Sequence, residues 1–554
     1  MTLLPLSNTN GARGFSLKSF VPKALVAVFV ACMLPTYWIA FHAPAVGTYH
    51  DDGIYLVTGK ALAEGKGYRI ISLPGELLQT KYPILFPAVL SVAWKIFPKF
   101  PENALFLKTI PFLSAILWLW LSYKLIKEET GARGVALGIV LLTAASSWVI
   151  YFSTTFMSET FFACLSSWAL IRLKRLEGRC GDDGVSLPLL FATSLVAASF
   201  LTRTVGAALV AAAAISLFLK RKYVSALMFL FGCAVLIGPW LWWQAVYGES
   251  ARAIDSYYSL SNYKSWNILW NFTVEQKFHV VMVNLIRIIF SPVSLLNLNR
   301  NAIGLFISIV IMLLTCSGFV RDARNHIGSL HFFMLFYFGI IVFWVWPPER
   351  FLLPMMPYLL LFAYKEFCRV CGRVFKQGNV PALFSLVLAA LLGVLMINGL
   401  LPATRETIKR HAVSVSFPSE QDDWKPIQEL MGWVRQNTPE DSILLGNLDP
   451  VYYLYTGRKA VRGFSADPYL LFYSGKPETA LGGVPDLIQR IVGYRVRYIV
   501  RTPSRFFMEG PIFNGILDRL LSEYPQAFHV VKVASVPTCR IIEVDQGKLL
   551  QALH

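Results

Sequence analysis

Charged residues are scarce in this chain of 554 residues: Asp, Glu, Lys and Arg together make up 15% of it, whereas 55% of the residues are hydrophobic. The apolar residues recur in runs of about 15 to 25, the length that a helix needs to cross the hydrocarbon core of a bilayer. Such a composition excludes a chain that is soluble over its whole length. The sequence therefore predicts a polytopic, α-helical membrane protein.

Acidic residues are scarcer still, because 33 Asp and Glu stand against 51 Lys and Arg, which gives a formal net charge of +18. An excess of this size is typical of proteins that bind nucleic acids. Here, however, the basic residues are spread over short connections between the apolar runs, where they orient a membrane protein. We expect no nucleic-acid partner.

Cysteine is also rare, and the eight cysteines lie mostly inside apolar runs or beside basic connections, so no disulfide framework is predicted. Cys368 and Cys371 form a C-x-x-C pair, but a second pair or nearby histidines, which would favour a metal site, are missing. An inert juxtamembrane pair is the favoured interpretation. The N-terminal apolar run has no convincing small-residue cleavage site after it, so we interpret it as an uncleaved first helix rather than a signal peptide.

Eleven apolar segments are predicted to span the membrane. The connections rich in Lys and Arg fall on alternate sides of successive spans, which makes those connections and the N-terminus cytoplasmic. The predicted spans cover residues 24–41, 104–123, 134–151, 158–172, 187–202, 205–219, 224–246, 302–320, 328–346, 351–364 and 381–400.

The opposite, extracytoplasmic face receives the longest connections and every candidate functional residue described below. The first of these loops is rich in Lys and Arg, but long loops translocate largely regardless of their charge. The expected outer segments are residues 42–103, 153–158, 202–204, 247–300, 346–350 and everything after 401.

Two further patterns describe the parts outside the spans. In the first outer loop, Ile54–Glu64 is predicted as a short amphipathic helix and Pro83–Phe97 as an apolar stretch too short to span; both should lie flat on the outer surface. Residues 1–400 would then be the membrane domain, and residues 401–554 a mixed α/β domain outside the membrane. In that domain we expect helices at 424–436, 485–492 and about 514–523, and strands at 442–446, 498–502 and near 528–543.

The first chemical element is the acidic pair Asp51-Asp52, about ten residues after the first span. A carboxylate at a membrane surface can accept a proton from an incoming hydroxyl or amine, or help to hold a divalent cation. The alternative is an ordinary turn, since Asp and Gly are common turn residues and Gly53 follows the pair. Glu159, at the second outer turn, could belong to the same site or, with Ser158, only cap the fourth span.

Two cations lie at later outer turns. Arg203 interrupts a long apolar stretch, where a charge at the bilayer centre costs about 2.5 to 3.5 kcal/mol on insertion scales. An outer turn lowers that cost. Arg350 begins a proline-broken helix whose N-terminal amides could help to bind an anion, although Arg350 could instead simply pair with Glu349.

This ordered set resembles lipid-linked-sugar glycosyltransferases of the GT-C fold, and specifically the bacterial branches of the protein O-mannosyltransferase and aminoarabinose transferase superfamily. The likeness covers residues 24–400. Two departures are an Asp-Asp pair in place of Asp-Glu and the absence of a second proline after the Lys-x-Pro element. The segments that carry the likeness are His50-Asp51-Asp52, Lys81-Tyr82-Pro83, Ser158-Glu159, Thr202-Arg203 and Glu349-Arg350-Phe-Leu-Leu-Pro354, with further likeness in Trp424–Arg458.

The resemblance implies an inverting transfer of a sugar from a polyprenyl-phosphate carrier to a lipid, glycan or protein, at a bacterial inner membrane. It implies that Asp51 is the general base, that Asp52 orients the acceptor or shares a divalent cation with Asp51 and Glu159, and that Glu159 shapes the pocket. Arg203 and Arg350, helped by Lys81, would hold the lipid phosphate. Such a donor needs no Gly-rich nucleotide loop, and none follows a predicted strand. The pocket residues expected on the acceptor side are His50, Tyr82, Tyr257 and Tyr258.

Two other classes of protein fit parts of the pattern. A transporter or flippase of lipid-linked sugars would place charges or Gly/Pro breaks near the middle of the membrane, but the polar residues of the spans between 134 and 219 gather at their outer ends. A non-catalytic scaffold that presents residues 401–554 would leave the placement of the acids and cations without an explanation. Aromatic residues of the 247–300 loop could equally be interfacial anchors.

Overall fold

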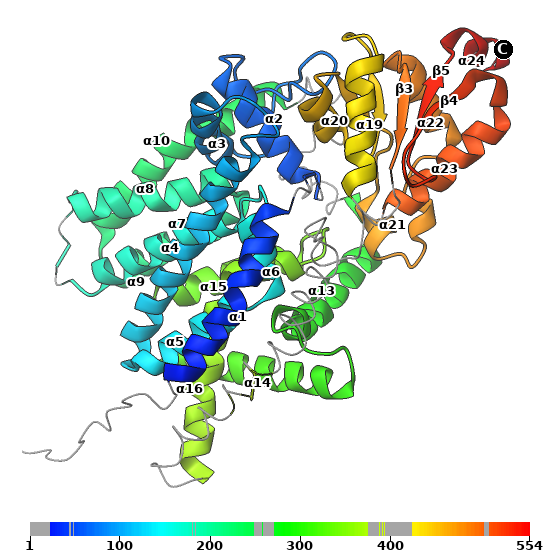
Figure 1. Cartoon of the computed structure of the whole chain (residues 1–554). Helices are drawn as coiled ribbons and strands as arrows, with labels where there is room; N and C mark the ends of the chain where they lie inside the picture. The colour runs from blue at the N-terminus through cyan, green and yellow to red at the C-terminus, as the bar shows by residue number, and fades with distance from the viewer. Residues whose placement is uncertain are drawn as a thin grey trace, which may run out of the picture.

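A helical body and an α/β body make up the part of the chain that the computed structural model describes (Figure 1). In Figure 1 the blue-to-green helices form the first body, and the yellow-to-red segment packs against one end of it. The described residues are 23–43, 46–47, 49–179, 181–182, 184–248, 258, 271–374, 424–502 and 509–553, with four more between 387 and 393.

The helical body contains two short 3-10 helices, η1 and η2, besides its α-helices. Its elements are α1 (Lys23–His42), α2 (Asp51–Ala63), α3 (Leu85–Ile96), α4 (Ala104–Thr130), α5 (Arg133–Ala144), α6 (Ser147–Thr154), α7 (Glu159–Glu177), α8 (Leu187–Thr202), η1 (Thr204–Gly206), α9 (Ala207–Leu219), α10 (Tyr223–Tyr247), α13 (Val274–Leu295), α14 (Ala302–Asn325), α15 (Ser329–Val342), η2 (Glu349–Met355) and α16 (Met356–Val374).

Five stretches of the described chain are long and apolar enough to cross a membrane: α4, α10, α13, α14 and the continuous η2–α16 segment. The pair α5 and α6, bent by 67°, passes the same test together. The chain is therefore a multi-pass membrane protein. Ten of the eleven predicted spans coincide with helices, and 381–400 lies almost wholly outside the described residues, so the number eleven is not confirmed.

The prediction that 247–300 is only an outer loop is wrong, because α13 occupies 22 of its residues. Polar side chains interrupt the apolar pattern of this helix and hid it in the sequence. They bind other segments: Asn284 Nδ2 donates to the Trp344 carbonyl at 2.8 Å, and Arg287 Nη2 donates to the Phe472 carbonyl of the α/β body at 3.1 Å. The polar residues that suggested a loop therefore form a face of α13 that contacts other segments.

The expected amphipathic helix at Ile54–Glu64 is also only partly right. A helix is present, but α2 begins at Asp51 and is buried almost continuously from Asp52 to Ala61. It therefore lacks the solvent-exposed face of an amphipathic helix. Helix α3 covers one side of it, and Gly59 permits the close approach, since a Cβ there would lie 3.1 Å from Leu90 Cβ. Helix α2 is therefore a core element that carries the acidic pair.

The α/β body contains a five-stranded sheet in the order β2-β1-β3-β5-β4. Strands β2, β1 and β3 are parallel, whereas β5 is antiparallel to both β3 and β4. Its strands are β1 (Leu444–Gly446), β2 (Ala460–Arg462), β3 (Tyr498–Arg501), β4 (Phe528–Val533) and β5 (Arg540–Val544). Its helices are α19 (Trp424–Asn437), α20 (Asp449–Thr456), α21 (Pro468–Phe472), η5 (Pro477–Thr479), α22 (Val484–Gly493), α23 (Glu509–Glu523), η6 (Pro525–Ala527) and α24 (Gln546–Leu553).

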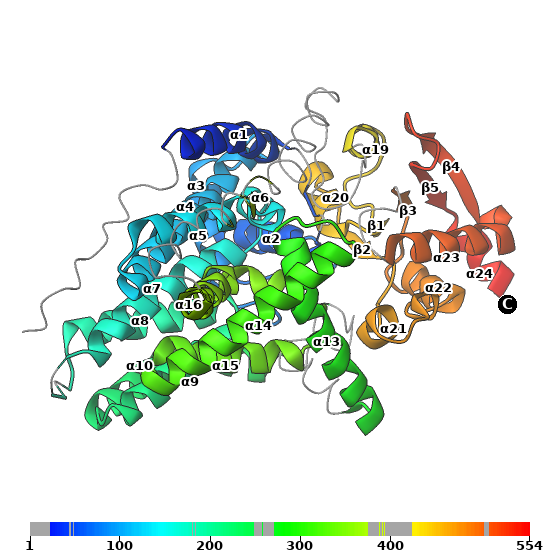
Figure 2. The same ribbon diagram turned by 90° about the horizontal axis from the view of Figure 1, so that it is seen from below.

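The helices and strands expected in this segment are present, while α20 and β2 were not expected. The domain boundary at residue 400 lies outside the described residues and stays a prediction. Figure 2 shows which end of the body meets the helices: α20, β1 and β2 lie beside α2, whereas β4, β5 and α24 lie at the far end with the C-terminus. The parallel half of the sheet therefore faces the acidic pair.

The contact between α14 and α16 provides a test of this packing. A Cβ at Gly318 would collide with the Phe362 carbonyl oxygen of α16, so Gly318→Ala must push the two helices apart. We expect a loss of about 1 to 3 kcal/mol, seen as a lower Tm of the detergent-purified protein. Gly339→Ala is the matched control, because a Cβ at this exposed position of α15 meets nothing within 4 Å. Equal Tm values for the two variants would contradict the packing.

Candidate active site

Asp51, the first residue of α2, lies between a phenol and a guanidinium. Tyr82 OH donates a hydrogen bond to its Oδ1 at 2.5 Å, and Arg350 Nη2 donates to its Oδ2 at 2.7 Å. The side chain of Asp51 is only 14% exposed. The structure thus joins three of the predicted segments, which the chain separates by as much as 299 residues.

A second acid and a second arginine complete the cluster. Arg203 Nη1 lies 2.7 Å from Glu159 Oε1, and Arg350 Nε lies 3.4 Å from the same oxygen. Both contacts are ion pairs by distance; among the described residues, neither Glu159 oxygen has a donor at hydrogen-bond geometry. Glu159 is only 1% exposed. Its carboxylate oxygens are therefore buried and can still accept hydrogen bonds. We call Asp51, Glu159, Arg203 and Arg350 the charge cluster.

Each member of the charge cluster lies near the end of an α-helix or in a 3-10 helix. Asp51 and Glu159 open α2 and α7, Arg203 lies between α8 and η1, and Arg350 is the second residue of η2. Carboxylates at helix N-termini also interact favourably with the helix dipole. These helix ends bring the four charges together at one end of the bundle.

Neutral groups hold the two guanidiniums in place. Ser158 Oγ accepts from Arg203 Nη1 at 3.1 Å and lies 3.2 Å from Tyr55 OH. The Phe351 ring lies under both guanidinium groups, 5.3 Å from Arg203 and 5.1 Å from Arg350. The alternative that Ser158 caps α7 is not what the structure shows, because its side chain makes no capping bond.

The alternative pairing of Arg350 with its neighbour is also not observed. Glu349 instead lies 3.8 Å from Arg287 of α13, while Arg350 is directed to Asp51 and Glu159. Arg350 is therefore available to the cluster and not to its own helix end.

Electrostatics at Asp51 are dominated by its cationic neighbours. Burial alone would raise the pKa of this carboxyl, but Arg350 and Lys81, together with the bond from Tyr82, outweigh burial and lower it to about 2. Lys81 also lies over the Tyr82 ring, with Nζ 5.1 Å from the centroid. Asp51 is thus ionised at every physiological pH, whereas the predicted role of Lys81 toward a lipid phosphate stays a prediction.

Asp52 has different partners from those of Asp51. Its Oδ2 accepts from the Gly47 backbone N–H at 2.7 Å and its Oδ1 from that of Tyr49 at 3.3 Å. Burial raises the pKa of Asp52 to about 6, against these amide bonds. The structure thus uses Asp52 to hold the turn that precedes α2, and its expected role toward an acceptor or a metal stays a prediction.

A divalent cation between Asp51, Asp52 and Glu159 does not fit this arrangement. Among the described residues, no group of three or more His, Cys, Asp or Glu side chains is placed to hold a metal ion. Asp51 and Glu159 face guanidinium groups, and Asp52 faces backbone amides. The hypothesis of a cation shared by these three acids is therefore not supported by their geometry.

The predicted acceptor residues separate into two groups. Tyr82 contacts Asp51, whereas His50 and Tyr258 point to a residue that the sequence analysis missed: Asp449, at the start of α20. The available signal was an acid that follows a buried strand and opens a helix. Tyr257 lies outside the described residues.

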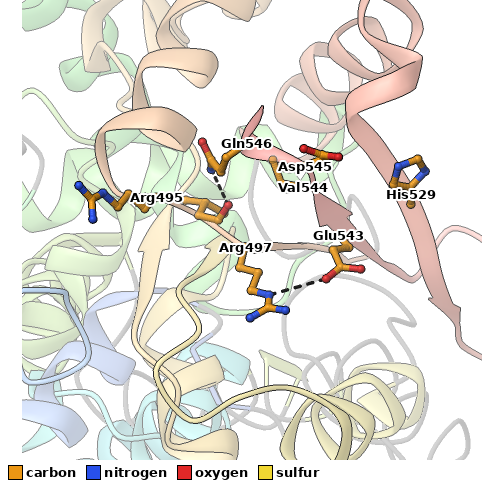
Figure 3. Close-up of a pocket in the computed structure, with 8 residues that line it drawn as sticks. Arg495, Arg497, His529, Glu543, Val544, Asp545 and Gln546 are labelled. Carbon is orange, nitrogen blue, oxygen red and sulfur yellow. Dashed lines mark hydrogen bonds and ion pairs between the residues drawn. The ribbon is translucent and has the colours of Figure 1, made fainter. Parts of the chain in front are cut away.

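A cavity of about 440 Å³ lies at the other end of the α/β body (Figure 3). Its lining includes Arg497 and Glu543, which form an ion pair at 3.7 Å, and Gln546, which donates to the Val496 carbonyl at 2.8 Å. The cavity lies where β3 begins, since Arg497 directly precedes this strand and Glu543 pairs with its first residue, Tyr498. Asp449 instead follows the end of the parallel strand β1. The cavity is therefore separate from the charge cluster.

No protein-family model matches the sequence, and no curated protein matches it. Solved structures do. ArnT from Cupriavidus metallidurans, in the apo state, is similar with a TM-score of 0.55 and 14% identity over 95% of this chain and 99% of that one. The structure of the same protein bound to undecaprenyl phosphate matches with the same TM-score and coverage at 13% identity.

The oligosaccharyltransferase of Archaeoglobus fulgidus, tethered to an acceptor peptide with an NVT sequon, matches with a TM-score of 0.50 and 13% identity over 94% of this chain and 74% of that one. The chain has the GT-C fold. At these identities the likeness shows the fold alone. The ArnT match covers nearly the whole of both chains.

The raised pKa of Asp52 predicts a pH-dependent stability. Its folded pKa of about 6 exceeds the unfolded value, so the folded state binds the proton more tightly and wild-type stability falls as the pH rises from about 4 to 6. The full effect is about 3 kcal/mol. Asn at this position can still accept an amide bond but does not titrate. We therefore expect the Tm of Asp52→Asn, relative to wild type, to increase from pH 4 to pH 7; a constant difference would contradict it.

Proposed function

We propose that this protein is an inverting glycosyltransferase that moves a sugar from a polyprenyl-phosphate carrier to an acceptor at the extracytoplasmic face of a bacterial inner membrane. The observation that carries the proposal is the Asp51–Arg350 contact of 2.7 Å within the charge cluster. It places the Asp51 carboxylate beside the Arg350 guanidinium, and Glu159 joins this guanidinium to that of Arg203. The shared GT-C architecture supports the proposal.

The proposed reaction is a direct displacement at the anomeric carbon. The acceptor oxygen or nitrogen attacks this carbon and loses its proton to Asp51, while the bond between the anomeric carbon and the phosphate oxygen breaks. The electron pair of that bond leaves with the polyprenyl phosphate, and the configuration at the anomeric carbon inverts. A phosphate leaving group needs no strong acid to protonate it, so one carboxylate and a cationic surround suffice.

The cations suit the charge that this reaction develops. The donor is a phosphodiester with one negative charge, and the product phosphate is a monoester that gains a second. Arg203 and Arg350 can form charge-assisted, bidentate bonds to such a group in a place of low dielectric. The bonds from these arginines strengthen as the leaving phosphate becomes more negative. They therefore lower the activation barrier of the transfer, and do not merely tighten donor binding. Lys81 adds one positive charge to a cluster that is otherwise neutral.

The remaining predicted residues have supporting roles. The open acceptor capacity of Glu159 suits a sugar hydroxyl of the bound donor. Tyr82 orients Asp51 by its hydrogen bond. The acceptor, whether lipid, glycan or peptide, would approach Asp51 from the side on which the α/β body lies, beside α2 (Figure 2).

Removing the charge of Asp51 should abolish most transfer. For Asp51→Asn we expect a loss of about 10²- to 10⁴-fold, because a carboxamide cannot accept the acceptor's proton. Mass spectrometry of the polyprenyl-phosphate sugars and envelope glycans should show one donor accumulating while one glycan or protein loses a single sugar. That pair of changes would also identify both substrates.

Asp52→Asn is the neighbouring control for this experiment, since its carboxyl is engaged by backbone amides. We expect its transfer to stay within about tenfold of wild type, because Asn can keep an amide bond of modest net worth. Unchanged donor and glycan profiles in the Asp51→Asn strain would refute the assignment of Asp51 as the base.

Arg350 should be tested through binding of the lipid phosphate. Loss of a hydrogen bond to a charged group costs about 1.5 to 3 kcal/mol, so Arg350→Ala should weaken undecaprenyl phosphate binding about 10- to 100-fold. Microscale thermophoresis of the purified full chain measures the change. Arg324 is exposed and lies in the last turn of α14, so Arg324→Ala should bind undecaprenyl phosphate as wild type does. Equal affinities of the two variants would show that Arg350 does not hold the phosphate.

A further inference from the structure

The turn that carries Asp51 is attached to the α/β body by a buried hydrogen-bond network. His50 Nε2 lies 2.7 Å from Asp449 Oδ1, and Tyr258 OH donates to Asp449 Oδ2 at 2.5 Å. Tyr258 OH in turn accepts from the Arg462 backbone N–H at 3.2 Å, at the end of β2. Asp449 is fully buried and His50 is 2% exposed. Both oxygens of one buried carboxylate are thus used to fix groups from two distant segments.

The backbone at His50 needs such an attachment. His50 has φ +60°, in the left-handed region that residues with a Cβ rarely adopt, and it directly precedes Asp51. A residue persists in such a conformation only where its surroundings hold it there. The backbone N–H groups of His50 and Asp51 donate to the carbonyls of Gly47 at 3.0 Å and Tyr49 at 2.6 Å, so the two residues belong to one tight turn. The direction in which Asp51 leaves this turn therefore depends on what holds the His50 imidazole.

Helix α20 packs against the same turn over several residues. A Cβ on Gly47 would collide with Val451, and one on Gly53 would lie 2.9 Å from Pro450 Cβ. Further along α2, the Lys60 ammonium lies 5.0 Å from the centroid of the Tyr453 ring. The glycines on either side of the acidic pair therefore let α20 approach to a distance that no larger residue permits.

We propose that Asp449 is a positioning residue for Asp51, acting through His50, so that the α/β body sets the geometry of the base. This inference rests on the proposed function. Asp449 contacts neither the charge cluster nor, in the proposed reaction, any reacting atom. Its carboxylate orients the His50 ring, the ring fixes the left-handed turn, and the turn directs Asp51 toward Tyr82 and Arg350.

The substitution that tests this chain of contacts is Asp449→Asn. A carboxylate accepts from both His50 and Tyr258, whereas a carboxamide of the same shape has one acceptor oxygen and can satisfy only one of them. We expect transfer per folded protein to fall about tenfold to a hundredfold, the effect of a misplacement of about 1 Å. Binding of undecaprenyl phosphate by the purified full chain should stay within about threefold of wild type, because Arg203 and Arg350 remain in place.

A double-mutant cycle separates positioning from general destabilisation. His50→Asn introduces a residue type that occurs at positive φ more often than most but is too short to reach Asp449. If Asp449 acts through His50, the double variant loses no more transfer than the more severe single variant. Asp518→Asn, the same substitution at a half-exposed carboxylate of the α/β body that pairs with Arg501, should transfer as wild type does.

Three outcomes would overturn the inference: normal transfer by Asp449→Asn, losses that multiply in the double variant, or an equal fall in phosphate binding and transfer. An Asp51→Asn strain is included in the same series. If it transfers normally, the proposed function fails; if it is inactive while Asp449→Asn is normal, only the positioning role fails.

Discussion

Four buried or half-buried charges at one end of the bundle neutralise one another, and the arrangement of the surrounding helices depends on their contacts. Moving one such ion out of water costs several kcal/mol even after relaxation, and only a partner at contact distance offsets this. Asp51, Glu159, Arg203 and Arg350 form three ion pairs of 2.7, 2.7 and 3.4 Å. Because Arg350 contacts both acids, no pair can move without exposing another charge. The starts of α2, α7 and η2 and the end of α8 are therefore set together.

Stability alone does not account for such a cluster. A buried network of ion pairs is often no more stabilising than apolar side chains of the same volume, although removing one partner costs about 3 to 5 kcal/mol. What the cluster does supply is a pair of oriented guanidiniums whose present partners are carboxylates. A phosphate, as another oxyanion, can replace a carboxylate at a guanidinium with little rearrangement. The cluster is thus suited to exchange one anion for another.

Under the proposed function this exchange also affects the base. In the structure the pKa of Asp51 is lowered to about 2, chiefly by Arg350 against the effect of burial, and such a weakly basic carboxylate is poorly matched to proton abstraction near neutral pH. A donor phosphate that takes over the Arg350 guanidinium removes this stabilisation of the carboxylate. The pKa of Asp51 then rises because burial is no longer opposed to the same extent. Donor binding would in this way prepare the base for the acceptor.

Sequence reasoning located the charges but not what positions them. The motif order placed Asp51, Glu159, Arg203 and Arg350 on one face, since each interrupts or borders an apolar run, and an interruption is visible in the chain. Asp449 was not found, because its partner His50 is 399 residues away and nothing in a strand–turn–helix pattern indicates a contact at that range. Helix α13 was not found for a related reason. Its polar residues Asn284 and Arg287 look like loop composition until the surfaces that they bind are known.

These missed features have a common location, which is where the α/β body meets the helices. Tyr473 OH donates to Asn284 Oδ1 at 2.9 Å, and Lys459 Nζ donates to Glu76 Oε1 at 2.7 Å, so the body is fastened to α13 and to the first loop as well as to α2. Polar contacts between segments far apart in sequence leave no local signal, unlike a membrane span, which requires a continuous apolar run of about 20 residues. The membrane part of such a chain is therefore readable from its sequence. The orientation of its acidic pair depends on a second body whose contacts appear only in three dimensions.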